Sequence, residues 1–191
     1  MIIHETERLR LRAWLEADRD LFAEINSDPK VVEFFPFRRN RADADALFDS
    51  NNRNIHETGF GFFALALREN DATIGFCGLA RTDLKPHLPD GTVEIGWRLA
   101  ARHWGKGYVT EAAGALLDYG FEERKLGEIV AIAVATNTRS IAVMKRIGMY
   151  CDPSRGFEHS GVPDTHPQLR PHVLYAITAD RRQRNGETAK R

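Results

Sequence analysis

Cysteine is scarce in this chain, and a charge excess is missing altogether. Two cysteines, Cys77 and Cys151, among 191 residues are too few for a disulfide framework, so a reducing cytoplasm is the expected location. Lys and Arg together number 27, as do Asp and Glu. The balance leaves no basic surplus that would point to nucleic acid or to a membrane surface as a partner.

Long apolar segments are missing as well. The longest uninterrupted run, residues 129–135, has seven members, whereas a membrane-spanning helix needs about 20. The first twelve residues, MIIHETERLRLR, carry charges throughout, so no secretory signal is expected. With 42% hydrophobic and 28% charged residues, the composition is typical of a globular domain. We expect one domain over residues 1–179 and a disordered polar tail over residues 180–191.

Period-two and helical patterns follow one another in the order β-α-α-β-β-β-α-β-α-β. The expected helices cover residues 15–28, 42–55, 109–121 and 138–147, and the expected strands cover residues 6–14, 60–67, 73–82, 92–99, 128–135 and 170–178. The fourth and fifth strands, 92–99 and 128–135, are joined by a helix, which is typical of a parallel crossover. The order therefore predicts an α/β domain with a mixed sheet.

The segment HWGKGYVTEAAGALLDYGF, which follows the strand at 92–99, is the most informative stretch. Gly105 and Gly107 lack a Cβ, and a helix starts directly after them, so free backbone N–H groups and the helix dipole favour a bound phosphate. A Walker A loop is excluded because Lys106 is followed by glycine, not Ser or Thr. A Rossmann fingerprint lacks its third glycine, since Thr110 stands there. The diphosphate of coenzyme A remains as the third candidate ligand.

The runs EIGWRLAARHWGKGYVTEAAGALLDYGF and IVAIAVATNTRSIAVMKRIGM resemble the GCN5-related N-acetyltransferase (GNAT) superfamily, and within it the RimJ/RimL-like group. The resemblance covers residues 6–178. It implies a mixed, mostly antiparallel sheet that splays between its fourth and fifth strands, with helices on both faces. It also implies direct acetyl transfer from acetyl-CoA to a primary amine, either a protein N-terminus or a small molecule, in a ternary complex. A homodimer is common among such proteins.

Two other functions compete with this one. A non-catalytic acyl-CoA-binding or regulatory module would keep the same cleft and the same glycine loop but not turn over. A nucleotide-phosphate enzyme is more distant, because both of its usual motifs are incomplete here.

The resemblance also implies which residues hold acetyl-CoA. The pyrophosphate motif of the family, [QR]-x-x-G-x-[GA], fits literally from Arg102 and with departures at both ends from Trp104. We prefer the register from Trp104, because the loop after Leu99 then has the family's length. Asn137 matches the asparagine of an N-x-x-S motif that contacts pantetheine, although the same residue type also caps helices. The implied contacts are Trp97, Arg98, Leu99, Trp104, Gly105, Lys106, Gly107, Tyr108, Val109 and Asn137.

For the chemical step, the resemblance points to Glu94 as the general base and to Ser140 as the group that protonates or hydrogen-bonds the leaving sulfur. Glu94 lies on the cleft strand, where burial would raise its pKa. A surface carboxylate and a first-turn serine bonded to backbone are the ordinary alternatives. The rival bases are Glu33, Glu158, His159 and His172.

Several other residue groups receive a structural interpretation. The histidine-rich loop over residues 157–172 lacks cysteine or clustered acidic ligands, so we expect no metal and a role in shaping the acceptor pocket. Cys77 is expected in the core rather than as an acyl carrier. One aromatic set is a candidate lining for an acceptor pocket, although core packing is the ordinary role of such residues: Trp14, Phe34, Phe35, Phe37 and Trp97.

Overall fold

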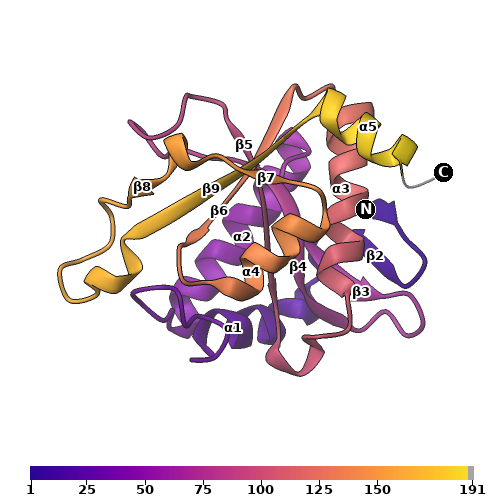
Figure 1. Ribbon diagram of the computed structural model, residues 1–191. Coiled ribbons are helices and arrows are strands. Elements are labelled where there is room, and N and C mark those ends of the chain that lie inside the picture. Colours follow the sequence, from indigo (N-terminus) through magenta and orange to yellow (C-terminus); the bar gives the residue numbers. More distant parts are fainter. Residues whose placement is uncertain (189–191) are drawn as a thin grey trace.

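A mixed sheet runs through the whole molecule in the computed structural model, which describes residues 1–188 (Figure 1). Within those residues the strands lie in the order β1-β2-β3-β4-β5-β6-β9-β7, and β8 pairs with β9. Neighbours are antiparallel except β5 and β6, which are parallel. The strands are β1 (Ile2–Glu5), β2 (Leu9–Arg12), β3 (Gly61–Leu67), β4 (Thr73–Arg81), β5 (Val93–Leu99), β6 (Glu128–Val134), β7 (Tyr150–Cys151), β8 (Phe157–Glu158) and β9 (Pro171–Thr178).

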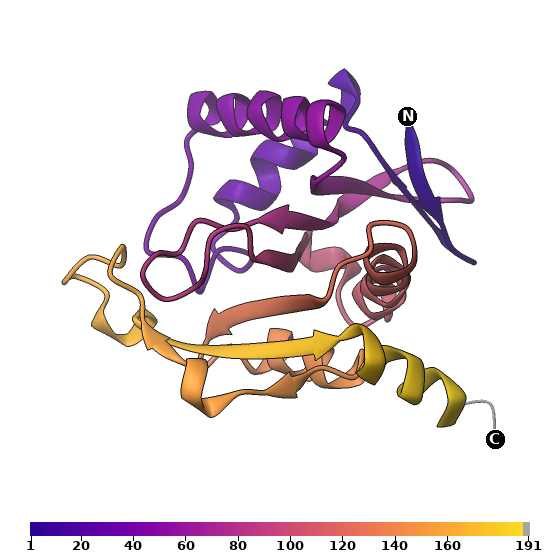
Figure 2. The ribbon, with the colours of Figure 1, turned by 90° about the horizontal axis from the view of Figure 1, so that it is seen from above.

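Helices cover both faces of this sheet, as the sequence predicts. Helices α1 and α2 lie on one side of β3–β5, and α3 lies on the opposite side (Figure 2). Each helix in residues 1–188 is too short or too polar to cross a membrane. The helices are α1 (Arg19–Ser27), α2 (Arg41–Thr58), α3 (Tyr108–Glu122), α4 (Thr138–Arg146) and α5 (Ala179–Thr188).

Helix α3 holds the two halves of the sheet together. Its buried stripe consists of small and branched residues: Ala112, Ala113, Leu116, Leu117 and Gly120. A Cβ at Gly120 would lie 2.7 Å from a side-chain carbon of Ile129 on β6 and 3.2 Å from one of Leu79 on β4. Only glycine therefore lets the helix approach both strands this closely.

Two expectations are corrected at the chain ends. The strand expected over residues 6–14 is shorter, β2, and a further strand, β1, precedes it. Thr6 forms the turn between them: its N–H donates to the Leu9 carbonyl (2.9 Å) and its hydroxyl accepts from the Leu9 N–H (3.2 Å). The tail is helical rather than disordered at 180–188. Arg182 fixes α5 by donating two hydrogen bonds to Asp118 on α3 (2.7 and 2.9 Å). Residues 189–191 of the expected tail lie outside the described residues.

Candidate active site

The sheet is closed on one side of β5 and open on the other. Strands β4 and β5 pair at seven consecutive positions, from Val93 to Leu99. Strands β5 and β6 pair at one position, Glu94 opposite Val130, although both strands continue beyond it. The two strands therefore diverge from Ile95 onward, which is the splay that the resemblance implies.

The backbone of β5 presents alternate residues to this opening. At the two ends of the β4–β5 ladder, the hydrogen bonds involve the Thr92 carbonyl (2.9 Å) and the Ala100 N–H (3.0 Å). In an antiparallel pair, every second residue directs both of its backbone groups to the same neighbour. The backbone N–H and carbonyl groups of the even-numbered residues of β5, including those of Arg98, therefore point toward β4. The backbone groups of Trp97 and Leu99 face β6, where the ladder has ended.

This alternation refines the expected set Trp97, Arg98 and Leu99. The backbone of Arg98 faces β4 and is not available to a ligand in the opening. The Leu99 carbonyl already accepts a hydrogen bond from the indole Nε1 of Trp104 (2.9 Å). Both groups of Trp97 and the N–H of Leu99 remain directed into the opening.

The glycine loop turns the chain from β5 into α3. Gly105 has φ +74° and Gly107 has φ +78°, a left-handed conformation that favours glycine. A Cβ at Gly105 would meet nothing within 4 Å, so this side of the loop is open. In the described part of the chain no side chain caps α3 at Gly107. The N–H groups of Tyr108 and Val109, in the first turn, therefore point outward without an intrahelical acceptor.

A support beneath this loop was not apparent from the sequence. Arg8, just before β2, donates from Nη1 to the Lys106 carbonyl (3.0 Å) and lies 4.8 Å from the centre of the Tyr108 ring. Its Nε bonds to Glu111 of α3 (2.7 Å), which also accepts from the Thr6 hydroxyl (2.6 Å). The loop conformation is thus fixed by residues about 100 positions away in the sequence, and no local sequence pattern could predict such a contact.

Asn137 and Ser140 lie on the far side of the opening, where α4 starts. Asn137 is the N-cap of α4, and its side-chain oxygen accepts from the Ser140 N–H (3.2 Å). Between them, Arg139 forms an ion pair with Glu33 and lies 4.7 Å from the centre of the Trp104 ring. The Arg139 side chain therefore connects α4 with the glycine loop and with the segment after α1.

Glu94 occupies the last closed position of the β5–β6 pairing. The side chain is half-buried, and desolvation raises the pKa of its carboxyl group to about 7. Among residues 1–188 no Lys or Arg forms an ion pair with it. A carboxylate of this kind titrates near neutral pH and can exchange protons with a substrate.

The rival bases lie in different surroundings. Glu33 is exposed and paired with Arg139, and Glu158 is exposed on β8. His172 stacks on Phe157 at 5.5 Å and lies 5.1 Å from His159 between ring centres. Desolvation lowers the pKa of His172, whose Nδ1 lies 2.8 Å from the Arg170 carbonyl oxygen. Across the described residues, no cluster of His, Cys, Asp or Glu could hold a metal ion.

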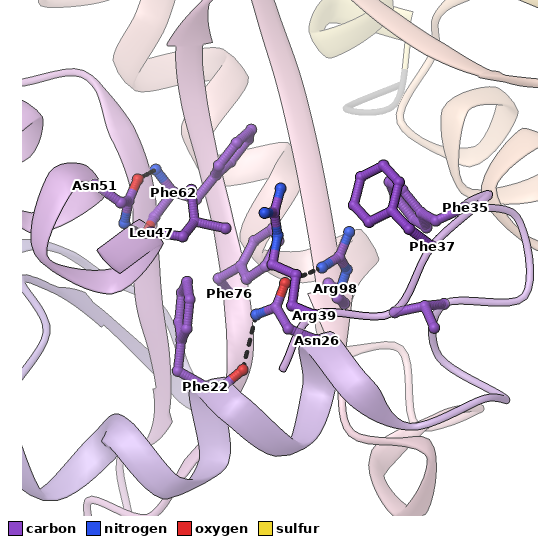
Figure 3. Close-up of a pocket in the computed structure, with 11 residues that line it drawn as sticks. Phe22, Asn26, Phe35, Phe37, Arg39, Leu47, Asn51, Phe62, Phe76 and Arg98 are labelled. Carbon is purple, nitrogen blue, oxygen red and sulfur yellow. Dashed lines mark hydrogen bonds between the residues drawn. The ribbon is translucent and has the colours of Figure 1, made fainter. Parts of the chain in front are cut away.

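A cavity of about 220 Å³ lies between α1, the α1–α2 segment and the sheet (Figure 3). Phe35 and Phe37 of the expected aromatic set line it, whereas Trp14 is buried in the core and Phe34 packs near Val134. Cys77 is also a core residue, and burial raises the pKa of its thiol. The aromatic lining is Phe22, Phe35, Phe37, Phe62 and Phe76, and the polar lining is Asn26, Asn51, Arg39 and Arg98.

The open ladder, the glycine loop and the cavity can be compared with known proteins. The profile of the acetyltransferase (GNAT) domain family matches residues 8–150. The chain belongs to the GNAT acetyltransferase family. It is an acyltransferase, and in this family an acetyl group passes from acetyl-CoA to an amine.

Relatives and solved structures agree with this assignment. The uncharacterized protein YkkB of Bacillus subtilis is 36% identical over 149 residues, which cover 76% of this acetyltransferase and 83% of YkkB. A GNAT-family acetyltransferase from Bacillus anthracis has a TM-score of 0.75 at 29% identity, covering 94% of this chain and 99% of the other. RimL, a ribosomal L7/L12 alpha-N-protein acetyltransferase solved with coenzyme A, shares the fold with a TM-score of 0.74 at 16% identity, covering 95% and 99%.

Proposed function

We propose that this acetyltransferase transfers the acetyl group directly to a primary amine while both substrates are bound. The open ladder between β5 and β6 carries the proposal, because unpaired amide groups can bind a substrate that itself contains amides. We also place the chain in the RimJ/RimL-like group, on the strength of its W-G-K-G loop and its N-x-x-S motif.

Backbone groups of this chain bind acetyl-CoA. The Trp97 carbonyl and the Leu99 N–H pair with the amide arm in the manner of an added strand. The loop from Trp104 to Val109 receives the diphosphate on its free N–H groups, and the exposed Lys106 adds a positive charge. The oxygen of Asn137 serves the helix cap, so its amide N–H groups are the part that contacts the arm.

Glu94 removes the proton that the attacking ammonium must lose, either directly or through a water molecule. Its position at the mouth of the opening and its pKa of about 7 suit a general base at neutral pH. After the attack, the backbone N–H that faces the opening at Trp97 donates to the negative oxygen. The intermediate then collapses with cleavage of the C–S bond, and the Ser140 hydroxyl hydrogen-bonds the departing sulfur. The second proton lost by the attacking nitrogen goes to this sulfur, which leaves as a thiol.

Three measurements test this function in order. Calorimetry with acetyl-CoA should show binding. A thiol-release assay over a panel of amines and peptide N-termini should then show turnover. Initial rates with both substrates varied should give intersecting double-reciprocal lines. Parallel lines, or an acetylated enzyme detected by mass spectrometry, would show a covalent intermediate and contradict direct transfer.

A further inference from the structure

The cavity beside β5 carries two cationic side chains that acetyl transfer does not explain. Arg98 extends from β5, and Arg39 comes from the segment between α1 and α2 (Figure 3). Asn26 at the end of α1 bonds the side chain of Arg98 and the backbone of Arg39. Its side-chain oxygen accepts from Arg98 Nη1 (2.5 Å), and its backbone carbonyl accepts from the Arg39 N–H (3.1 Å). The Arg98 side chain is therefore held in place, the Arg39 backbone is anchored beside it, and both residues line one largely apolar cavity.

Ten arginines in residues 1–188 form an ion pair with a carboxylate, and Arg39 and Arg98 are not among them. The buried Arg12, for example, is neutralised by Asp18 at 2.7 Å. Among residues 1–188 neither Arg39 nor Arg98 forms an ion pair with a carboxylate, and the cavity lining contains no Asp or Glu. Aromatic rings also lie against both guanidinium groups, Phe35 at 4.3 Å from Arg98 and Phe37 at 5.1 Å from Arg39. Burial, followed by repulsion from Arg39, lowers the pKa of Arg98 to about 10, so the Arg98 side chain remains charged at neutral pH.

Two positive charges in an apolar cavity are costly unless an anion joins them. The cavity, at about 220 Å³, has room for a group the size of an aromatic ring and not for a folded protein surface. Residues 94, 96 and 98 share one face of β5, because side chains alternate along a strand. Four residues of strand span roughly 13 Å, so one small molecule can reach from Arg98 toward Glu94.

We propose that the acceptor is a small primary amine that carries a carboxylate on an apolar or aromatic body. The carboxylate binds Arg98 and Arg39, the body lies against the phenylalanine rings, and the amine points toward Glu94. This inference rests on the proposed function, since it uses the same site. It disfavours polyamines, whose charges Arg39 and Arg98 would repel.

The test compares acceptors that differ in one group. The pairs are L-phenylalanine with phenethylamine, and 4-(aminomethyl)benzoate with 4-methylbenzylamine, with spermidine as a polycation. In the thiol-release assay we expect kcat/KM to be about 10- to 100-fold higher for at least one carboxylated member, the range that a charge-assisted hydrogen bond supplies. Arg39→Gln should remove most of this preference. Arg38→Gln, the same change at an exposed neighbouring residue outside the cavity, should retain it.

Binding provides a readout that does not depend on turnover. Calorimetry with 3-phenylpropionate, a carboxylate without an amine, should show binding that weakens at least tenfold in Arg39→Gln and not in Arg38→Gln. Arg98→Gln should behave like Arg39→Gln if it folds. Equal or higher rates with phenethylamine, 4-methylbenzylamine or spermidine would overturn the inference and leave the acetyltransferase function intact. If no amine released thiol, the proposed function would fail, and the absence of Arg39-dependent carboxylate binding would then overturn the inference separately.

Discussion

At the scale of the residue, Glu94 combines partial burial with the lack of a cationic partner among the described residues. Its pKa is raised by desolvation to about 7, and a base acts in its deprotonated form. The kcat of the wild-type enzyme should therefore fall as the pH drops through about 7. Glu94→Gln should lower kcat about 10²-fold or more at high pH and flatten this part of the profile. Steady-state kinetics across the pH range measures both effects.

Glu158→Gln is the matched control, because Glu158 is exposed on β8. This control should leave the pH profile of kcat unchanged.

The pH dependence of stability gives an independent check, and its sign follows from the raised pKa of Glu94. A raised carboxyl pKa favours the folded state at low pH, and this contribution is lost as the pH rises through the folded pKa. Glu94→Gln should thus match the wild-type Tm near about pH 4 and exceed it above about pH 7. A Tm lowered equally at both pH values would contradict the assigned environment.

The sequence predicted where two candidate residues lie in the fold, while their chemical roles stay predictions. Glu94 and Asn137 stand at the opening because each lies inside a strongly patterned segment, a strand end or a helix start. For Arg98, the resemblance implies a contact with acetyl-CoA, whereas the structure places its side chain in the cavity. The role of the Arg98 side chain depends on Asn26 and Arg39, which are more than 50 residues away, so no local sequence pattern could predict it.

At the scale of the element, the turn into α3 offers a direct test of the glycine loop. Gly107→Glu adds a negative charge where the diphosphate is proposed to bind, so acetyl-CoA affinity should fall at least tenfold by calorimetry. The change also strains a residue at φ +78°. Gly91→Glu controls for that strain, since Gly91 has φ +76° and its nearest neighbour is the flexible Arg81 guanidinium at 3.4 Å. Equal affinities in the two variants would remove the loop from the binding site.

Helix α5 is a second element whose role can be measured. Arg182 bonds Asp118 through two nitrogens and also donates to the Gly114 carbonyl (3.0 Å). Arg182→Ala should lower the free energy of unfolding by about 1 kcal/mol, because the pair is bidentate and only partly exposed. Gln183→Ala, an exposed neighbour, should change it little. Chemical denaturation of both variants decides whether α5 is docked on α3 in solution.

Long periodic elements were predictable, and short or context-dependent ones were not. The pattern located α3, β5 and β6 to within about two residues, since each buries a continuous apolar stripe. Strands β7 and β8 have two residues each, too few for any periodicity. Helix α5 is polar throughout and is held by a tertiary ion pair, which overrides the compositional signal for disorder.

At the scale of the whole molecule, the sheet is two half-sheets that meet at one backbone pair and share α3. A ligand that pairs with the exposed edge of β5 binds only the folded state. Acetyl-CoA at 100 times its Kd should therefore raise stability by about 2.7 kcal/mol. Hydrogen exchange should slow most in the backbone of β5 and of the loop after it. Protection confined to α1 and α2 would place the ligand elsewhere.

The guanidinium of Arg139 touches the Trp104 ring on one side and Glu33 on the other. Trp104 belongs to the loop that is proposed to bind acetyl-CoA, and Glu33 lies in the same α1–α2 segment as Arg39. Binding of acetyl-CoA beside Trp104 can thus affect the proposed acceptor cavity through the contacts of Arg139. Binding of each substrate would then change the affinity for the other by the same factor.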